Sequence, residues 1–170
     1  MSADSPHRHY HDEQYGFPID SDNELFGRLI LEINQAGLSW TTILNKQENF
    51  RTAYSEFDIH SIANYDEAER ARLLSDAGII RNKLKVNAAI HNAGQILRLQ
   101  DGYGSFGLWL DHHYPLSKDE WVKLFKKTFK FTGGEITNEF LMSSGYLPGA
   151  HIATCPVYKK ILEEGPKWAD

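Results

Sequence analysis

Residues 31–40 read LEINQAGLSW, and they decide the fold because they describe a tight corner between two helices. Gly37 suits a helix end, since glycine readily adopts the left-handed backbone that closes many helices. Ser39 suits the start of the next helix, because its hydroxyl can accept a hydrogen bond from a first-turn N–H. The corner therefore predicts that Glu32 and Trp40 lie about one helical turn apart.

The helix before this corner is predicted over residues 21–37. Ser21 and Glu24 have the spacing of a capping box, which marks a helix start. Glu32 shares one narrow face with apolar residues of that helix, so it lies at the edge of a buried surface. A carboxylate there is most often solvated or salt-bridged. If it is buried and ionised, it needs a hydrogen-bond partner, and that partner can be a ligand.

The rest of the chain also shows helical periodicity, and no segment shows useful strand-like alternation. We therefore predict an all-α fold in a single domain over residues 1–170. Within it, residues 21–100 form a helical core, and residues 1–20 and 117–170 form a second helical lobe. Residues 100–116 are expected to be rich in loops because they contain three glycines. A lysine stripe follows the helix after Ser117 and consists of Lys123, Lys126, Lys127 and Lys130. It is interpreted as a solvated face, with a phosphate-facing patch as the alternative.

Residues 66–99 read as helix, tight hairpin and helix. The simplest interpretation is an ordinary connection between two helices. The alternative is an anchor for a DNA phosphate, because a helix N-terminus presents backbone N–H groups and favours an anion. The hairpin carries backbone and basic groups suited to that second role: Gly78, Ile80, Arg81, Lys83 and Lys85.

Composition limits the classes of function. The net charge of −5 argues against a generally basic nucleic-acid binder, so any DNA contact must come from a local basic face. No apolar run is long enough to cross a membrane, and the polar N-terminus does not look like a signal peptide. The single cysteine fits a reducing compartment, so a cytoplasmic location without membrane association is expected.

Four ordered motifs resemble the bacterial 3-methyladenine DNA glycosylase I family. Residues 32–40 (EINQAGLSW) resemble its E-x-x-Q-A-G-L-S-W signature, and residues 10–16 (YHDEQYG) resemble Y-H-D-x-E-W-G with tyrosine for tryptophan. Residues 76–85 resemble the D-A-G-I-I-R-x-x-x-K hairpin, and residues 129–133 resemble F-K-F-V-G. The resemblance implies a helix-hairpin-helix glycosylase fold.

The same resemblance implies a monofunctional enzyme that hydrolyses the N-glycosidic bond of 3-methyladenine in alkylated double-stranded DNA. Tyr10 and Trp40 offer ring faces to a cationic base, and Glu32 can accept a hydrogen bond from its exocyclic amine. We assign Glu32 to recognition and assistance of catalysis, not to general-base chemistry. Gly37 and Leu38 are predicted to contact DNA at the corner. Leu38 is expected to wedge between base pairs, although a core leucine is an equal alternative.

The family pattern also implies a structural zinc ion. This chain supplies three of its ligands, His11, His151 and Cys155, but not the N-terminal cysteine. Three protein ligands are fewer than a closed structural zinc site uses. Either the site is lost, or Asp4, His7, His9 or water completes it.

Two rival functions remain open at this point. One is a DNA-binding protein that has the same fold but no catalytic activity, and it predicts DNA affinity without base release. The other is a helical metal-binding or interaction module, which predicts metal without DNA binding. A monomer is expected in each case.

Overall fold

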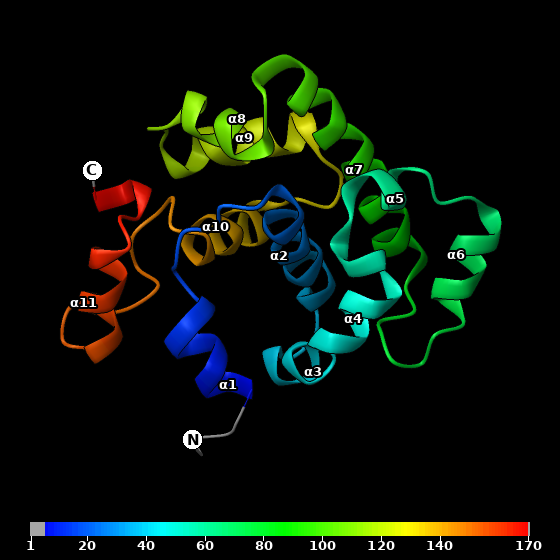
Figure 1. Cartoon of the computed structure of the whole chain (residues 1–170), viewed down its shortest axis with the longest axis horizontal. Coiled ribbons are helices and arrows are strands. Elements are labelled where there is room, and N and C mark those ends of the chain that lie inside the picture. The colour runs from blue at the N-terminus through cyan, green and yellow to red at the C-terminus, as the bar shows by residue number, and fades with distance from the viewer. Residues whose placement is uncertain (1–5, 170) are drawn as a thin grey trace.

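The central element of the computed structural model is helix α2 (Asp22–Gln35), around which the other helices are arranged (Figure 1). The structure describes residues 6–169. Every residue of α2 from Leu25 to Asn34 is buried, including Arg28 and Glu32. Because this helix is buried on all sides, its polar residues Arg28, Glu32 and Asn34 lie inside the protein.

The described residues form helices and loops without a strand, so the predicted all-α class is confirmed. The first half contains α1 (Pro6–His9), the π-helix η1 (Tyr10–Gln14), α2, α3 (Trp40–Asn45), α4 (Gln47–Ala53), the 3₁₀ helix η2 (Ser55–Phe57), α5 (Ile59–Ala63) and α6 (Glu67–Leu74). The second half contains α7 (Lys83–Tyr103), α8 (Phe106–His113), α9 (Lys118–Thr128), α10 (Gly134–Ser143), α11 (Pro156–Glu163) and the 3₁₀ helix η3 (Lys167–Ala169). None of these helices is long and apolar enough to span a lipid bilayer.

Side-chain caps begin several helices as the sequence predicts. Ser21 accepts a hydrogen bond from the Glu24 N–H, and Ser117 forms a full capping box with Glu120. At the first of these caps only half of the predicted box is present, because the Glu24 carboxylate is paired with Arg51 at 2.6 Å. Each cap satisfies a backbone N–H that lacks a partner within its helix.

Residues 100–116 differ from the expected loop. Helix α7 continues through Gly102 to Tyr103, and α8 follows after two residues. The physical reason lies in tertiary contacts, since Asp22 at the start of α2 accepts hydrogen bonds from the N–H groups of Phe106 and Gly107 at 2.8 and 3.2 Å. A negative side chain at this helix N-terminus stabilises α8, although the segment contains glycines.

Candidate active site

The corner between α2 and α3 has the predicted form. Helix α2 ends at Gln35, and the exposed Gly37 has a φ of +81°, in the region that favours glycine. The Ser39 hydroxyl accepts a hydrogen bond from the Thr42 N–H at 3.2 Å and caps α3. The corner is therefore set by local backbone chemistry.

Lys85 stabilises the corner from the other side. Its Nζ donates to the carbonyl oxygens of Asn34 at 2.8 Å and Ala36 at 2.7 Å, and the side chain is only 4% exposed. These carbonyls stand at the C-terminus of α2, where a positive charge is favourable. This position replaces the predicted phosphate contact of Lys85, because a buried ammonium held by two carbonyls is not available to DNA.

A cavity of about 740 Å³ opens beside the corner. It lies between the end of α2, the start of α3 and the first turns of α10. Its lining consists of Glu32, Gln35, Ala36, Gly37, Trp40, Gly133, Gly134, Glu135, Ile136, Asn138 and Glu139. The predicted pair, Glu32 and Trp40, thus meets in one cavity that is large enough for a purine.

Glu32 is the most unusual group in this cavity. It is only 2% exposed, and its Oε1 has no hydrogen-bond partner among the described residues. Burial and, to a smaller extent, the negative charge of Glu139 raise the pKa of Glu32 to about 8, although Arg28 acts to lower it. A buried polar atom without a partner is costly, and because Glu32 lines an open cavity, a ligand that enters the cavity can supply the partner.

The aromatic residues form a continuous wall. The Tyr10 ring meets Trp40 edge to face at a centroid distance of 5.3 Å, and it stacks on Tyr15 at 5.5 Å. Tyr10 is 4% exposed, with the Arg28 guanidinium 5.2 Å from its ring centroid. Trp40 therefore lines the cavity directly, and Tyr10 supports it from behind.

Sequence analysis missed three residues of this site: Arg28, Tyr15 as a polar group, and Glu139. Arg28 precedes Glu32 by four residues, so helical spacing alone places it on the same face. Tyr15 belongs to the motif of residues 10–16, which gives no indication of a partner for its hydroxyl. Glu139 lies in α10, more than 100 residues along the chain from Glu32, and no local pattern connects the two.

The hairpin between α6 and α7 presents a mixed set of groups. Arg81 and Lys83 are exposed, whereas Ile80 is partly buried against the core. The N–H of Gly78 donates to the Asp76 carboxylate at 2.8 Å, so this particular amide is already used within the hairpin. Two of the five predicted DNA-contact groups in the hairpin, Arg81 and Lys83, thus have charged side chains on the surface.

Leu38 lies at the outer tip of the corner. Its side chain is 38% exposed, so it is not a core leucine. An apolar side chain that projects beside an open cavity has the placement that a wedge requires.

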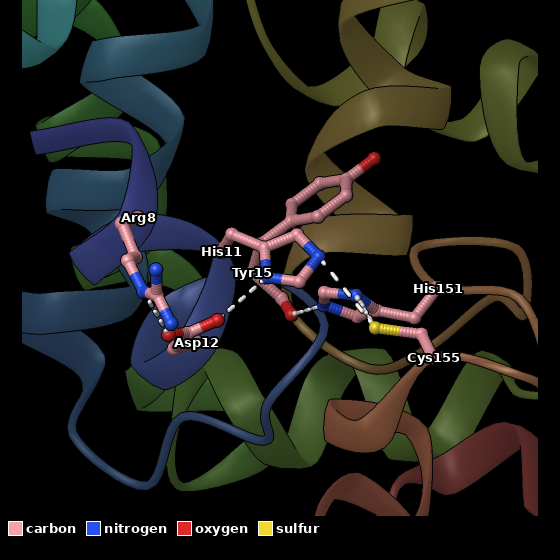
Figure 2. Close-up of polar contacts among 6 residues, drawn as sticks. All are labelled: Arg8, His11, Asp12, Tyr15, His151 and Cys155. Carbon is pink, nitrogen blue, oxygen red and sulfur yellow. Dashed lines mark hydrogen bonds and ion pairs between the residues drawn. The ribbon is translucent and has the colours of Figure 1, made fainter. Parts of the chain in front are cut away.

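The three predicted metal ligands come together at a second place, between η1 and the loop before α11 (Figure 2). Cys155 Sγ lies 3.7 Å from His11 Nε2 and 3.8 Å from His151 Nδ1. Ligands of a tetrahedral zinc ion are separated by about 3.5 Å, given typical Zn–S and Zn–N bond lengths. The donor set and the two distances from Cys155 Sγ therefore fit zinc, and all three donor atoms lie within 4.8 Å of one another.

Further hydrogen bonds orient both histidines toward this point. The other ring nitrogen of His11 lies 2.7 Å from Asp12 Oδ1, and the other nitrogen of His151 lies 2.8 Å from the Tyr15 carbonyl oxygen (Figure 2). Partners of this kind select the ring tautomer that leaves the opposite nitrogen free for a metal. Both rings are thus prepared for an ion on the Cys155 side.

The proposed fourth ligands are placed elsewhere or are not described. The His7 ring nitrogen Nε2 lies 2.6 Å from Thr41 Oγ1, and His9 is paired with Glu13 at 3.4 Å. Asp4 lies outside the described residues. The described geometry thus gives His7 and His9 other partners and leaves water as a candidate.

Comparison with known proteins identifies the family. The sequence profile of the methyladenine glycosylase family matches residues 1–120. The chain is 34% identical to DNA-3-methyladenine glycosylase 1 of Escherichia coli strain K12, over 93% of this chain and 94% of that protein. The chain belongs to the methyladenine glycosylase family.

Solved structures of this family have the same fold. A crystal structure of 3-methyladenine DNA glycosylase I matches with a TM-score of 0.81 and 33% identity, over 92% of this chain and 96% of that one. A variant of 3-methyladenine DNA glycosylase I, crystallised in complex with 3-methyladenine, matches with a TM-score of 0.82 and 27% identity, over 92% of this chain and 94% of that one. The predicted family is therefore confirmed.

Proposed function

We infer that this chain is a DNA-3-methyladenine glycosylase that excises 3-methyladenine in base excision repair. Its similarity to the E. coli enzyme extends over most of both chains. Membership of the methyladenine glycosylase family confirms the activity that the sequence predicts. The protein is thus an enzyme that acts on alkylated DNA.

The observation that carries the mechanism is the buried Glu32 carboxyl group, which lines the cavity beside Trp40 with one oxygen unpartnered. Because its pKa is raised to about 8, Glu32 holds a proton at neutral pH while the cavity is empty. A cationic base lowers that pKa and takes the place of the proton. A neutral adenine has no such effect, so the pocket prefers the methylated base by a difference of affinities.

The reaction uses the same charge. The N-glycosidic bond breaks with its electron pair going to the base, which neutralises the positive charge of 3-methyladenine. Water then adds to the sugar carbon C1′ and loses a proton. Glu32 binds the cationic base in the cavity, and the neutral product binds less tightly than the substrate did.

We also propose how the enzyme holds DNA. Arg81 and Lys83 project from the hairpin at the start of α7, which has no acidic residue in its first turn. Phosphates of double-stranded DNA are the anions that such a surface binds. Leu38 then enters the base stack while the damaged base turns into the cavity. A monomer has all these groups in one chain. We propose that it acts in the cytoplasm, because its relatives in Escherichia coli and Haemophilus influenzae are bacterial DNA glycosylases.

A structural zinc ion held by His11, His151 and Cys155 completes the proposal. These residues join η1 to the loop before α11, so the ion would connect the two ends of the chain. A bound zinc ion supplies structural cross-linking there, because the cluster contains none of the residues that line the base cavity.

Release of free base from methylated duplex DNA tests this function. Glu32→Gln and Trp40→Ala are each expected to slow single-turnover release by roughly tenfold or more, because each removes an interaction with the cationic base. Glu135→Gln is the matched control, since Glu135 lines the same cavity but is exposed. Circular dichroism confirms that each variant is folded.

The outcomes separate the two DNA-binding hypotheses. Wild-type protein that binds methylated duplex and releases no base is the non-catalytic protein of the same fold. Release that is unchanged in both the Glu32 and the Trp40 variants shows that the cavity is not the site of base recognition.

A further inference from the structure

Glu139 is a second acidic residue in the base cavity. It lies on α10, whose buried residues Thr137, Phe140 and Leu141 pack into the protein interior. Glu135 and Asn138, on the opposite face of the same helix, line the cavity together with Glu139. The register of α10 is therefore set by its apolar face, which leaves Glu139 directed into the space that Glu32 lines.

The Tyr15 hydroxyl holds Glu139 in this position by donating to its Oε2 at 3.3 Å. Tyr15 is itself fixed by its main chain, since its N–H donates to the Tyr10 carbonyl at 2.7 Å and its own carbonyl lies 2.8 Å from a ring nitrogen of His151. The motif that residues 10–16 resemble has tryptophan at this place. Tryptophan has no hydroxyl group, so the O–H···O hydrogen bond between Tyr15 and Glu139 depends on the tyrosine of this chain.

We propose that Glu139 is a specificity-determining residue of the pocket, whose carboxylate adds a second negative charge near Glu32 and favours a positively charged purine over a neutral one. The inference rests on the proposed function, because it concerns the base that the pocket admits. Two like charges in one cavity repel each other unless a proton or another cation lies between them. A cationic base relieves this repulsion, and a neutral base does not.

Other charged groups act on the same site and set the size of the effect. Arg28 opposes the negative charge from the Tyr10 side of α2, and Glu135 adds an exposed carboxylate at the cavity. Charge at Glu139 contributes to the raised pKa of Glu32, and charge at Arg28 acts in the opposite direction. The Glu139 contribution is thus distinct from the effect of burial and is removed by a single substitution.

Calorimetric binding of two free bases tests the proposal in mildly alkaline buffer. One is 3-methyladenine, which is uncharged there, and the other is 3,9-dimethyladeninium, which is permanently cationic. Glu139→Gln is expected to lower the ratio of the cation's association constant to that of the neutral base by about tenfold, as loss of one nearby charge predicts. Tyr15→Phe is expected to lower this ratio by about threefold, because it removes the hydrogen bond that positions Glu139.

Glu163→Gln is the control, with the same substitution at an exposed position of α11 outside the cavity, and it is expected to change the ratio less than about twofold. A ratio that Glu139→Gln leaves unchanged, or an equal loss of affinity for both bases, overturns the proposal. Single-turnover base release by the wild type is measured in parallel. If the wild type releases base but Glu139→Gln leaves the affinity ratio unchanged, only the role of Glu139 is overturned. If the wild type releases no base, the proposed function is overturned. In that case the affinity ratio still decides the role of Glu139.

Discussion

Two buried ionisable residues, Lys85 and Glu32, lie beside the corner between α2 and α3. They differ in whether their polar atoms have hydrogen-bond partners. Lys85 donates to two carbonyl oxygens, of Asn34 and Ala36. Glu32 has an oxygen without any partner among the described residues. The protein thus uses Lys85 for its own structure and keeps Glu32 for a ligand, although both are nearly inaccessible to solvent.

The stability of the free protein is expected to depend on pH through Glu32. Its pKa is raised on folding from an ordinary 4.5 to about 8, so between these values the folded protein holds a proton that the unfolded chain has lost. The contribution to stability is complete below the unfolded pKa and is lost as pH rises toward the folded one. Glutamine does not titrate, so Glu32→Gln does not lose stability in this way as pH rises. We expect the free energy of unfolding of this variant to be higher than that of the wild type by on the order of 2 kcal/mol in alkaline buffer.

Thermal unfolding at several pH values measures this difference. An advantage of about 4–8 °C in Tm is expected for Glu32→Gln in alkaline buffer, and a much smaller one in acidic buffer. Glu135→Gln, an exposed change of the same kind, is the control. An advantage that is equal at all pH values would show that Glu32 does not titrate as its surroundings indicate.

At the scale of elements, the pocket is made by helix ends. The C-terminus of α2, the N-terminus of α3 and the first turns of α10 surround the cavity. The hairpin before α7 is a further helix end, and its residue Lys85 reaches back to α2. Backbone groups at helix ends and the residues beside them therefore link the proposed DNA-binding hairpin to the base cavity.

The hairpin predicts a specific salt dependence of DNA binding. Arg81→Ala and Lys83→Ala are each expected to reduce the slope of log affinity against log salt by about 1, since each removes one phosphate contact. Neither is expected to change the binding of free 3-methyladenine. Fluorescence anisotropy with labelled duplex across a salt series measures the slopes.

Lys126→Ala is the control for this prediction, because Lys126 is exposed on α9 in the lysine stripe. An unchanged slope supports the interpretation of the stripe as a solvated face. A slope reduced by Lys126→Ala but not by the hairpin variants would move the DNA contact from the hairpin to α9.

At the scale of the whole molecule, residues close to the two ends of the chain meet at the proposed metal cluster. His11 and Cys155 are 144 residues apart in sequence and 3.7 Å apart in space. A cross-link between such distant residues restricts the unfolded chain and therefore stabilises the folded one. The same segment carries Tyr10 and Tyr15, so the cluster also fixes the aromatic wall of the pocket.

Metal removal is therefore expected to destabilise the protein by about 2–4 kcal/mol, by analogy with a cross-link that closes a long loop. Elemental analysis of the purified protein is expected to find one zinc ion per chain. Chelation is expected to lower Tm in the wild type and to leave it unchanged in Cys155→Ser. Purified protein without metal, with a Tm insensitive to added zinc, would contradict the assignment.

Several features followed from the sequence alone because they depend on neighbours within one or two helical turns. The all-helical class came from periodicity, the caps at Ser21, Ser39 and Ser117 came from three-residue spacings, and the corner at Gly37 came from glycine's freedom at positive φ. The closeness of Glu32 and Trp40 also followed, since one short corner connects them. Such features are set by short-range hydrogen bonds and sterics.

Other features were decided only by the tertiary structure. Helix α8 forms where a loop-rich segment was expected, because Asp22 of α2 accepts hydrogen bonds from its first N–H groups in addition to the local cap at Ser105. Lys85 is withdrawn from the surface because the end of α2 binds its ammonium. Glu139 joins Glu32, and Cys155 joins His11, across more than 100 residues of chain. Contacts of this length depend on how whole helices pack against each other, and no local pattern of residues specifies that packing.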